Sequence, residues 1–362
     1  MKNNIDIAIV GGGVIGSSIA YNLCGSSSKI SLFEKSSVGD SGATASSGGL
    51  LRVFDPDPLL SRLAHRSMEY YLDWSKKKLP GDSGVTTNGM LYLASNNYHK
   101  TIDFCKSISA DYPIDIIDKI DVKKKFPYIK TDNYKYAIYE NNGGYGDVKQ
   151  TAKSYINGAI GLGLDLHENC FIKNIIELNN GWRLFTDNGV YDANYLVIAG
   201  GAYSNKLIND LAYNTRTIAI PYFSKKGNTF DISIINEGDK TFSRPFSDSS
   251  FLCGSQEFDW IDNPDMKIDL EDRHVKDASL RAVKMFGPDI VWRGGKLGFD
   301  AYTDTFRPLF GPYRDNVFVA TGFSGRGYKL TPYVSYLASE FILNNYIDQD
   351  FIELYSYIGS GD

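Results

Sequence analysis

The chain has 362 residues, and its 43% hydrophobic and 22% charged residues are typical of a globular protein with one large domain or two ordinary ones. A net charge of -5 excludes the basic surface of a nucleic-acid-binding protein, so we interpret the short lysine clusters at 76–78 and 123–125 as solvated helix surface. No apolar run approaches the roughly 18 residues that a membrane span needs.

The cysteines and histidines argue against a metal site or a disulfide framework. Four cysteines are scattered without a C-x-x-C pair, and four histidines lie far apart. The N-terminus runs directly into a glycine turn, without the charged and apolar segments of a secretory signal. We therefore expect a cytoplasmic protein that has neither a metal ion nor disulfides.

The first element that we predict is a strand, the apolar run 5–10, which ends at the glycine turn "GGGVIG". A helix follows the turn, and a second strand, "KISLFEK", ends near Glu34. The spacing of Gly11, Gly13 and Gly16 satisfies G-x-G-x-x-G, and Glu34 lies at the distance that this motif requires of its acid. The pattern predicts a dinucleotide-binding unit.

Each residue of this motif has a physical task. Gly11 makes the tight turn, Gly13 lets the backbone approach a pyrophosphate, and Gly16 lets helix and strand pack closely. The helix N-terminus adds N–H groups and a partial positive charge. Glu34 would accept hydrogen bonds from ribose hydroxyls, and an acid at this place favours FAD or NAD over NADP.

A run of small residues, 41–52, separates this unit from the next helix, and its place favours a loop pressed against a ligand over a flexible linker. Asp57 and Pro58 have the residue types of an N-cap and a first helical position. Apolar residues then recur at helical spacing, at Leu59, Leu60, Leu63, Met68, Tyr71 and Leu72.

Two later stretches repeat the pattern of strand and glycine turn. A buried strand over 195–199 runs into one glycine turn, and the last unit contains "NVFVATGFSGRGYKLTP". Thr331 and Pro332 there have the residue types of an N-cap and a first position, which predicts a helix over 333–343.

The stretches 85–140 and 215–290 lack this alternation of strand and helix. Three units with the pattern of a dinucleotide-binding fold, separated by two segments without it, predict a discontinuous cofactor domain and an inserted substrate domain. The boundaries that we expect are 1–80, 145–214 and 291–362 for the cofactor domain, and 81–144 and 215–290 for the substrate domain.

The order of these motifs resembles that of the D-amino acid oxidase superfamily of FAD-dependent enzymes, and most of all its branch of glycine oxidases and monomeric sarcosine oxidases. The similar segments span nearly the whole chain: "IAIVGGGVIGSSIAYNL" with "LFEK", "GATASSGGLL", "VIAGGAYS", "YTDTFRPLFG" and "FVATGFSGRGYKLTP". The resemblance implies an α/β fold, in which a Rossmann-like, glutathione-reductase-type FAD domain carries an inserted mixed-sheet α+β substrate domain.

The resemblance also implies which residues face FAD. The positions that match are Gly11, Gly13, Gly16, Glu34, Lys35, Thr44, Ala45, Gly49, Leu50, Ile172, Gly200, Gly325, Arg326, Gly327, Tyr328 and Lys329. Of these, Ile172 would meet the adenine end, and residues 325–329 would face the flavin pyrimidine. The positive end of the helix predicted after Pro332 would point at the reduced flavin.

Lys329 and Arg52 are the first candidates for substrate contact. In sarcosine oxidases the lysine of the loop similar to "GFSGRGYK" holds the substrate carboxylate, and an arginine similar to Arg52 lines the same site. Two such cations would bind a carboxylate by charge-assisted hydrogen bonds. The alternative is structural: Lys329 caps a loop, and Arg52 pairs with Asp55 or Asp57.

Three departures from the family concern the flavin and the substrate. Where sarcosine oxidases attach FAD to a cysteine, this chain has Asp300, so we expect non-covalent FAD. Glycine oxidases hold the substrate carboxylate with an arginine at the same place, and the reversed charge of Asp300 argues against an ordinary α-amino acid bound in their fashion. Asp300 would instead recognise a cationic group or a backbone N–H. The lysine that promotes the oxygen reaction in sarcosine oxidase aligns near Leu252, which is compatible with a dehydrogenase that uses another acceptor.

We predict that the protein oxidises the C–N bond of a small amine, imino acid or amino acid by hydride transfer to flavin N5, giving an imine. The predicted catalytic residues are Lys329, Arg52, Tyr302 and Asp300, although core packing is an equal alternative for the tyrosine. Three other functions stay open. They are a dehydrogenase subunit that passes electrons to a partner rather than to oxygen, a biosynthetic flavoenzyme for an unusual or carrier-bound amino acid, and an NAD-dependent dehydrogenase.

Overall fold

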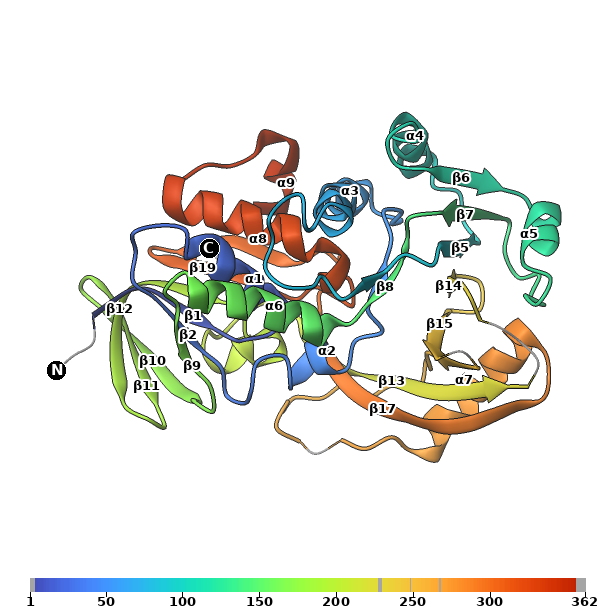
Figure 1. Ribbon diagram of the computed structural model, residues 1–362. Helices are drawn as coiled ribbons and strands as arrows, with labels where there is room; N and C mark the ends of the chain where they lie inside the picture. Colours follow the sequence, from blue (N-terminus) through green and yellow to red (C-terminus); the bar gives the residue numbers. More distant parts are fainter. Residues whose placement is uncertain (1–3, 227–229, 248, 267, 356–362) are drawn as a thin grey trace.

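The computed structural model describes residues 4–226, 230–247, 249–266 and 268–355. Within these residues the strands form two sheets of eight strands each and a third sheet of three strands. Figure 1 shows the two large sheets side by side, with strand β8 (Gly144–Gly146) of the small sheet between them. The expected cofactor domain includes residues 1–3 at its start and residues 356–362 at its end, and both ranges lie outside the described residues.

The first sheet is built around the N-terminal strand. Its strands are β1 (Asn4–Val10), β2 (Ile30–Phe33), β9 (Asp165–His167), β10 (Ile172–Leu178), β11 (Gly181–Thr186), β12 (Val190–Ile198), β18 (Leu309–Arg314) and β19 (Val317–Thr321). β1 pairs in parallel with β2 and β12, and β12 with β19, as in a Rossmann-like sheet. β10, β11 and β18 add antiparallel pairs at the edges.

The second sheet is mixed. Its strands are β5 (Met90–Ala94), β6 (Ile114–Ile117), β7 (Tyr136–Glu140), β13 (Asn214–Lys225), β14 (Ser233–Asn236), β15 (Thr241–Ser247), β16 (Ser250–Cys253) and β17 (Ile290–Tyr302). The long strand β17 pairs with β13 in this sheet, although the boundary expected at 291 placed it in the cofactor domain. The small sheet contains β8 with β3 (Leu50–Leu51) and β4 (Val85–Thr86).

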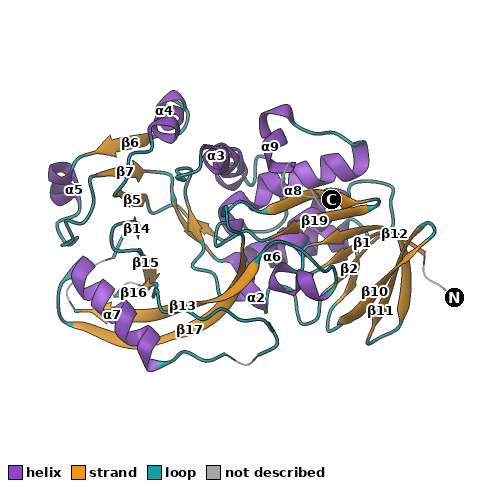
Figure 2. Cartoon of the chain, turned by 180° about the vertical axis from the view of Figure 1, so that it is seen from behind, coloured by secondary structure: helices purple, strands orange, loops and turns teal. Residues whose placement is uncertain are grey.

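The helices divide between the two large sheets. They are α1 (Val14–Leu23), α2 (Gly42–Ala45), α3 (Pro58–Leu72), α4 (His99–Ser107), α5 (Lys119–Lys125), α6 (Val148–Gly161), α7 (Asp272–Phe286), α8 (Gly327–Asn344) and α9 (Ile352–Tyr355), with 3-10 turns at Gly201–Lys206 and Gln349–Phe351. α1 packs against α6 and α8 on the first-sheet half, whereas α4, α5 and α7 lie on the other half (Figures 1 and 2). In the part of the chain described, no helix combines the length and apolarity that crossing a membrane requires.

Helix α3 begins as its sequence predicts. Asp57 is the N-cap, its carboxylate accepts a hydrogen bond from the Leu59 N–H at 2.9 Å, and Pro58 is the first helical residue. Five of the six apolar residues at helical spacing are buried, whereas the sixth, Leu72, is 40% exposed. The small-residue run before α3 contains the single helical turn α2 and the short strand β3 as well as loop.

Helix α8 begins earlier than predicted. The residue types of Thr331 and Pro332 predict that the helix begins next to them, but it begins at Gly327, and Pro332 lies inside it. Because proline has no N–H, the carbonyl of Tyr328 four residues earlier lacks its helical partner. This carbonyl accepts a hydrogen bond from the Tyr71 hydroxyl on α3 at 2.8 Å. A tertiary contact replaces the missing bond, which the local pattern could not show.

Candidate active site

A cavity of about 970 Å³ has walls from both large sheets. Its size is at the upper end of the roughly 300–1,000 Å³ of ligand sites. It is lined by the glycine turn after β1, the loop before β3, the ends of β12 and β19, strands β13 and β17, and the start of α8. Every site residue predicted from the sequence lines this cavity except Gly16 and Ala45.

The glycine turn after β1 has the geometry that a pyrophosphate requires. Gly11 has a φ of +105°, and a Cβ there would lie 2.6 Å from the carbonyl oxygen of Ala199. A Cβ on Gly16 would lie 2.0 Å from the carbonyl oxygen of Gly11, so this glycine serves packing and not the cavity wall. Gly13 is the N-cap of α1 and has no side chain that would fill the space between the helix N-terminus and the cavity that it lines.

Glu34 has a structural role in addition to the predicted contact with a ribose. Its Oε2 accepts a hydrogen bond from the Gly12 N–H at 2.7 Å, and its Oε1 accepts bonds from the N–H and hydroxyl of Ser36, each at 2.9 Å. The carboxylate lines the cavity but is only 6% exposed. Glu34 therefore also fixes the glycine turn against β2, which the motif alone did not indicate.

The second sheet holds the small-residue loop in place with two cations. Lys296 on β17 donates to the Ala45 carbonyl at 2.8 Å, and Arg244 on β15 donates to the Gly48 carbonyl at 2.6 Å. Thr44 in the same loop accepts a hydrogen bond from the Val14 N–H at the start of α1. Sequence analysis missed both cations because they lie about 200 residues or more from the loop.

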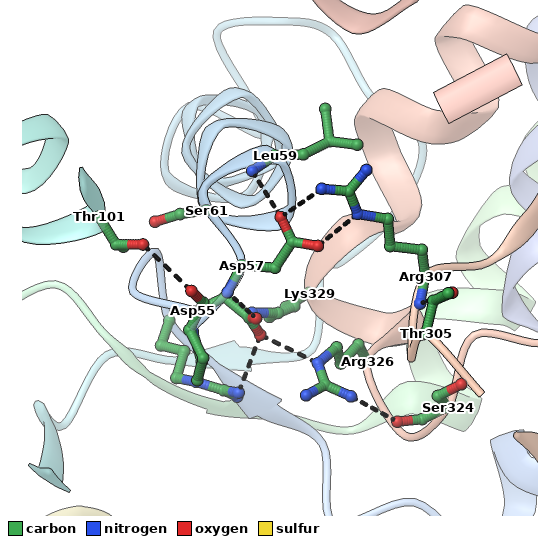
Figure 3. Close-up of polar contacts among 12 residues, drawn as sticks. Asp55, Asp57, Leu59, Ser61, Thr101, Thr305, Arg307, Ser324, Arg326 and Lys329 are labelled. Atoms are coloured by element: carbon green, nitrogen blue, oxygen red, sulfur yellow. Dashed lines mark hydrogen bonds and ion pairs between the residues drawn. The ribbon is translucent and has the colours of Figure 1, made fainter. Parts of the chain in front are cut away.

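Asp55 is the centre of a buried charge cluster (Figure 3). Its Oδ2 lies 2.8 Å from Lys329 Nζ, 3.1 Å from Arg326 Nε and 3.4 Å from Arg52 Nη2. Asp55 is fully buried, and Lys329 and Arg52 are 1% and 8% exposed. The alternative that Arg52 pairs with Asp55 is thus observed, whereas Asp57 pairs with Arg307.

Three cations share one carboxylate, and this determines the charge states of the cluster. Although burial alone would raise the pKa of Asp55, Lys329, Arg326 and Arg52 together hold it well below its usual range. Burial, together with the nearby Arg52, lowers the pKa of Lys329 to about 7 against the attraction of Asp55. Asp55 is therefore ionised at neutral pH and is shared by three cationic side chains, of which Arg52 is also attracted by the buried Glu140.

Asp300 is bonded to backbone N–H groups, one of the two roles expected for it. Its Oδ1 accepts from the Ala301 N–H and its Oδ2 from the Gly325 N–H, both at 2.8 Å. Burial raises its pKa to about 6, partly offset by these N–H groups and by Arg216. Burial also raises the pKa of Tyr302, which lines the cavity, to about 12.

The sequence of the chain also matches a known family. Residues 6–341 match the profile of the DAO family, described as "FAD dependent oxidoreductase". The chain belongs to this family. It is an enzyme, an oxidoreductase with FAD as its cofactor, and the open N-terminus of α1 and the glycine turn fit the FAD pyrophosphate.

The alignments with two relatives cover most of this chain and most of each relative. The glycine oxidase of Bacillus subtilis (strain 168) is 23% identical over an alignment of 374 positions, which covers 98% of this chain and 97% of that protein. The monomeric sarcosine oxidase of Streptomyces avermitilis is 23% identical over an alignment of 374 positions, which covers 95% of this chain and 94% of that protein.

Solved structures of the same fold include the L-proline dehydrogenase from P. horikoshii. It aligns with a TM-score of 0.86 at 18% identity and covers 99% of this chain and 98% of its own. The glycine oxidase from Bacillus cereus aligns with a TM-score of 0.77 at 21% identity and covers 96% and 97%. These likenesses confirm the predicted fold of a Rossmann-like FAD domain combined with a mixed sheet.

Proposed function

We propose that this enzyme oxidises the C–N bond of a small amino acid or imino acid whose carboxylate binds at Arg52, Arg326 and Lys329. The observation that carries this proposal is the surplus of donors around Asp55. All three cations meet the same carboxylate oxygen, and the Nε of Arg52 is buried without a hydrogen-bond partner among the described residues. A substrate carboxylate would supply the missing acceptor.

The relatives support the class of substrate. They are named glycine oxidase and sarcosine oxidase, after two small compounds that carry both an amine nitrogen and a carboxylate. FAD, when bound, accepts a hydride from the carbon that bears the nitrogen. The chain's own residues hold the carboxylate, and thus the reacting carbon, in one orientation. Apolar wall residues such as Ile218 and Ile220 exclude water from the cavity.

We propose that FAD is bound without a covalent link. Asp300 stands at the place where sarcosine oxidases have their attachment cysteine, and both of its oxygens are occupied by backbone N–H groups. The four cysteines, Cys24, Cys105, Cys170 and Cys253, are buried and unpaired. The unpaired thiols also support the proposal that the protein works in a reducing cytoplasm.

A dehydrogenase that passes electrons to a partner is a second candidate. Leu252, the position near which the oxygen-promoting lysine of sarcosine oxidase aligns, is 1% exposed and is not part of the cavity wall. An apolar residue there supplies no charge to stabilise a reduced oxygen species. This observation favours another acceptor over oxygen.

The test is an anaerobic titration of the purified yellow protein with a panel of amino acids, imino acids and amines. We expect at least one carboxylate-bearing amine to bleach the flavin, and the amine that lacks the carboxylate to bleach it far more slowly. If dithionite bleaches the flavin but no amine does, the proposed reaction is wrong. Admitting air to the bleached enzyme then separates the two acceptors, because fast reoxidation with peroxide formation identifies an oxidase.

A further inference from the structure

A second arginine in the same cavity also has an unused donor. Four buried side-chain polar atoms have no hydrogen-bond partner among the described residues, and two of them are the Nε atoms of Arg52 and Arg216. Both arginines line the cavity. Because buried polar groups are almost always paired, two unpaired guanidinium donors in one cavity indicate two acceptor positions for a ligand.

Two aromatic rings lie beside the guanidinium of Arg216. Its guanidinium carbon lies 4.2 Å from the ring centroid of Phe258 and 4.5 Å from that of Tyr302. Aromatic rings attract the charge of a guanidinium but offer no oxygen or nitrogen acceptor for its N–H groups. The side chain of Arg216 has no hydrogen bond or ion pair with another described residue, and its Nε is buried without a partner.

The carboxylates near Arg216 are engaged elsewhere. Arg216 on β13 is opposite Asp300 on β17, but the oxygens of Asp300 accept from Ala301 and Gly325. Asp259 lies close in the chain segment that meets β13, and its carboxylate is paired with Arg273. The charge of Arg216 is therefore not matched by an ion pair within the described protein.

We propose that Arg216 is a second anion-binding position, and that the substrate is an amino or imino acid with two acidic groups. The α-carboxylate binds at the Asp55 cluster and the second carboxylate at Arg216. The planar edge of a guanidinium matches a carboxylate by two parallel hydrogen bonds, which makes Arg216 a specificity-determining residue. The proposal rests on the proposed function, since it assigns the first carboxylate to the same cluster.

The test measures binding to the oxidised holoenzyme, which needs no turnover. Malonate, succinate and glutarate are each compared with their monoamides, and Kd is measured from the change in flavin absorption or by calorimetry. We expect at least one diacid to bind about 10- to 100-fold more tightly than its monoamide, because the amide removes the negative charge that would pair with the guanidinium and one of its two acceptor oxygens.

Variants then assign this preference to Arg216. Arg216→Gln should remove the preference for the diacid, and Arg216→Lys should keep part of it. Arg293→Gln is the matched control, because Arg293 is exposed on β17 and donates to Ser224 outside the cavity; it should leave both Kd values unchanged. Flavin content and thermal unfolding of each variant show that it folds.

The outcomes separate this inference from the proposed function. Equal Kd values for every diacid and its monoamide overturn the inference, even if a monocarboxylic amino acid bleaches the flavin. Loss of FAD from Arg216→Gln and Arg216→Lys also overturns it, because the arginine would then serve the cofactor. A diacid preference that depends on Arg216 supports the second position, even if no amine bleaches the flavin and the proposed reaction fails.

Discussion

The cavity has a cofactor end, near Glu34 and Thr44, and a proposed substrate end, near Arg216 and the charge cluster of Asp55. The two ends differ in how their polar side chains are paired. At the cofactor end, Glu34 and Thr44 bond to the N–H groups of the glycine turn and of α1, all within the first 44 residues. At the substrate end, three cations from two distant segments, Arg52 from one and Arg326 and Lys329 from the other, share one oxygen of Asp55. The side chain of a fourth cation, Arg216, has no hydrogen-bond or ion-pair partner among the described residues. The cofactor end is thus organised by local geometry, whereas at the proposed substrate end three cationic side chains share a single carboxylate.

The largest effect that we expect comes from removing the only anion of the substrate-end cluster. Asp55→Asn leaves Arg52, Arg326 and Lys329 buried beside a neutral amide, so the free energy of unfolding should fall by about 3–5 kcal/mol. Denaturant unfolding of the holoenzyme measures it. Asp57→Asn is the control, because asparagine also caps a helix and the Arg307 pair is partly exposed; its cost should be about 1 kcal/mol or less. Similar losses in both variants would show that Asp55 does not hold the cluster together.

A smaller loss of stability, with loss of FAD, should follow a methyl group at the cofactor end. Gly16→Ala places a Cβ 2.0 Å from the Gly11 carbonyl oxygen, so we expect a cost of about 1–3 kcal/mol and a protein that retains little flavin. Thermal unfolding and flavin absorbance per protein measure both effects. Gly161→Ala is the matched control in α6, where a Cβ meets nothing within 4 Å and should stabilise the helix slightly. A yellow, stable Gly16→Ala protein would refute the close packing described for this turn.

Removing one cation of the substrate end should affect the substrate and spare the cofactor. Lys329→Met removes a charge-assisted hydrogen bond, so KM for a carboxylate substrate should rise about 10- to 100-fold, with flavin content unchanged. Steady-state kinetics beside a flavin spectrum provide the comparison. If KM does not change, Lys329 does not touch the substrate; if FAD is lost, the two ends are not independent.

The smallest effect is a pH dependence that only the substrate end should show. Burial lowers the pKa of Lys329 to about 7, so its charge is present below this pH and is lost as the pH rises through it. Because a carboxylate needs the charged form, its Kd should rise above about pH 7, by at most about tenfold per pH unit. Lys329→Met should lose this dependence. Retention of FAD should stay flat over the same range, and a parallel change would contradict the assignment to Lys329.

The sequence predicted the cofactor end well because its information is local. The spacing of Gly11, Gly13 and Gly16 and the acid Glu34 depend on one strand, one turn and one helix, and the structure has them as expected. The same local reasoning failed at Pro332, where the bond from Tyr71 lets the helix begin earlier. Local residue types do not report contacts between distant segments.

The substrate end could be predicted only in part, for the same physical reason. Lys329 and Arg52 were proposed as neighbours, and both line the cavity. The sequence suggests Asp55 as a partner of Arg52 but not of Lys329, because Lys329 is 274 residues away from Asp55 in the chain. Arg216 belongs to no sequence motif. Its unpaired Nε becomes visible only in the structure, where β13 packs against the segment that contains Phe258.

The most direct test of an anion-deficient substrate end is a crystal structure of the holoenzyme with a bound diacid that is not oxidised, such as succinate. We predict that one carboxylate lies within about 3 Å of the Nε of Arg52, beside Lys329, and that the other reaches the edge of Arg216. A diacid bound elsewhere, with both Nε atoms satisfied by groups of the protein or by the flavin, would contradict the account.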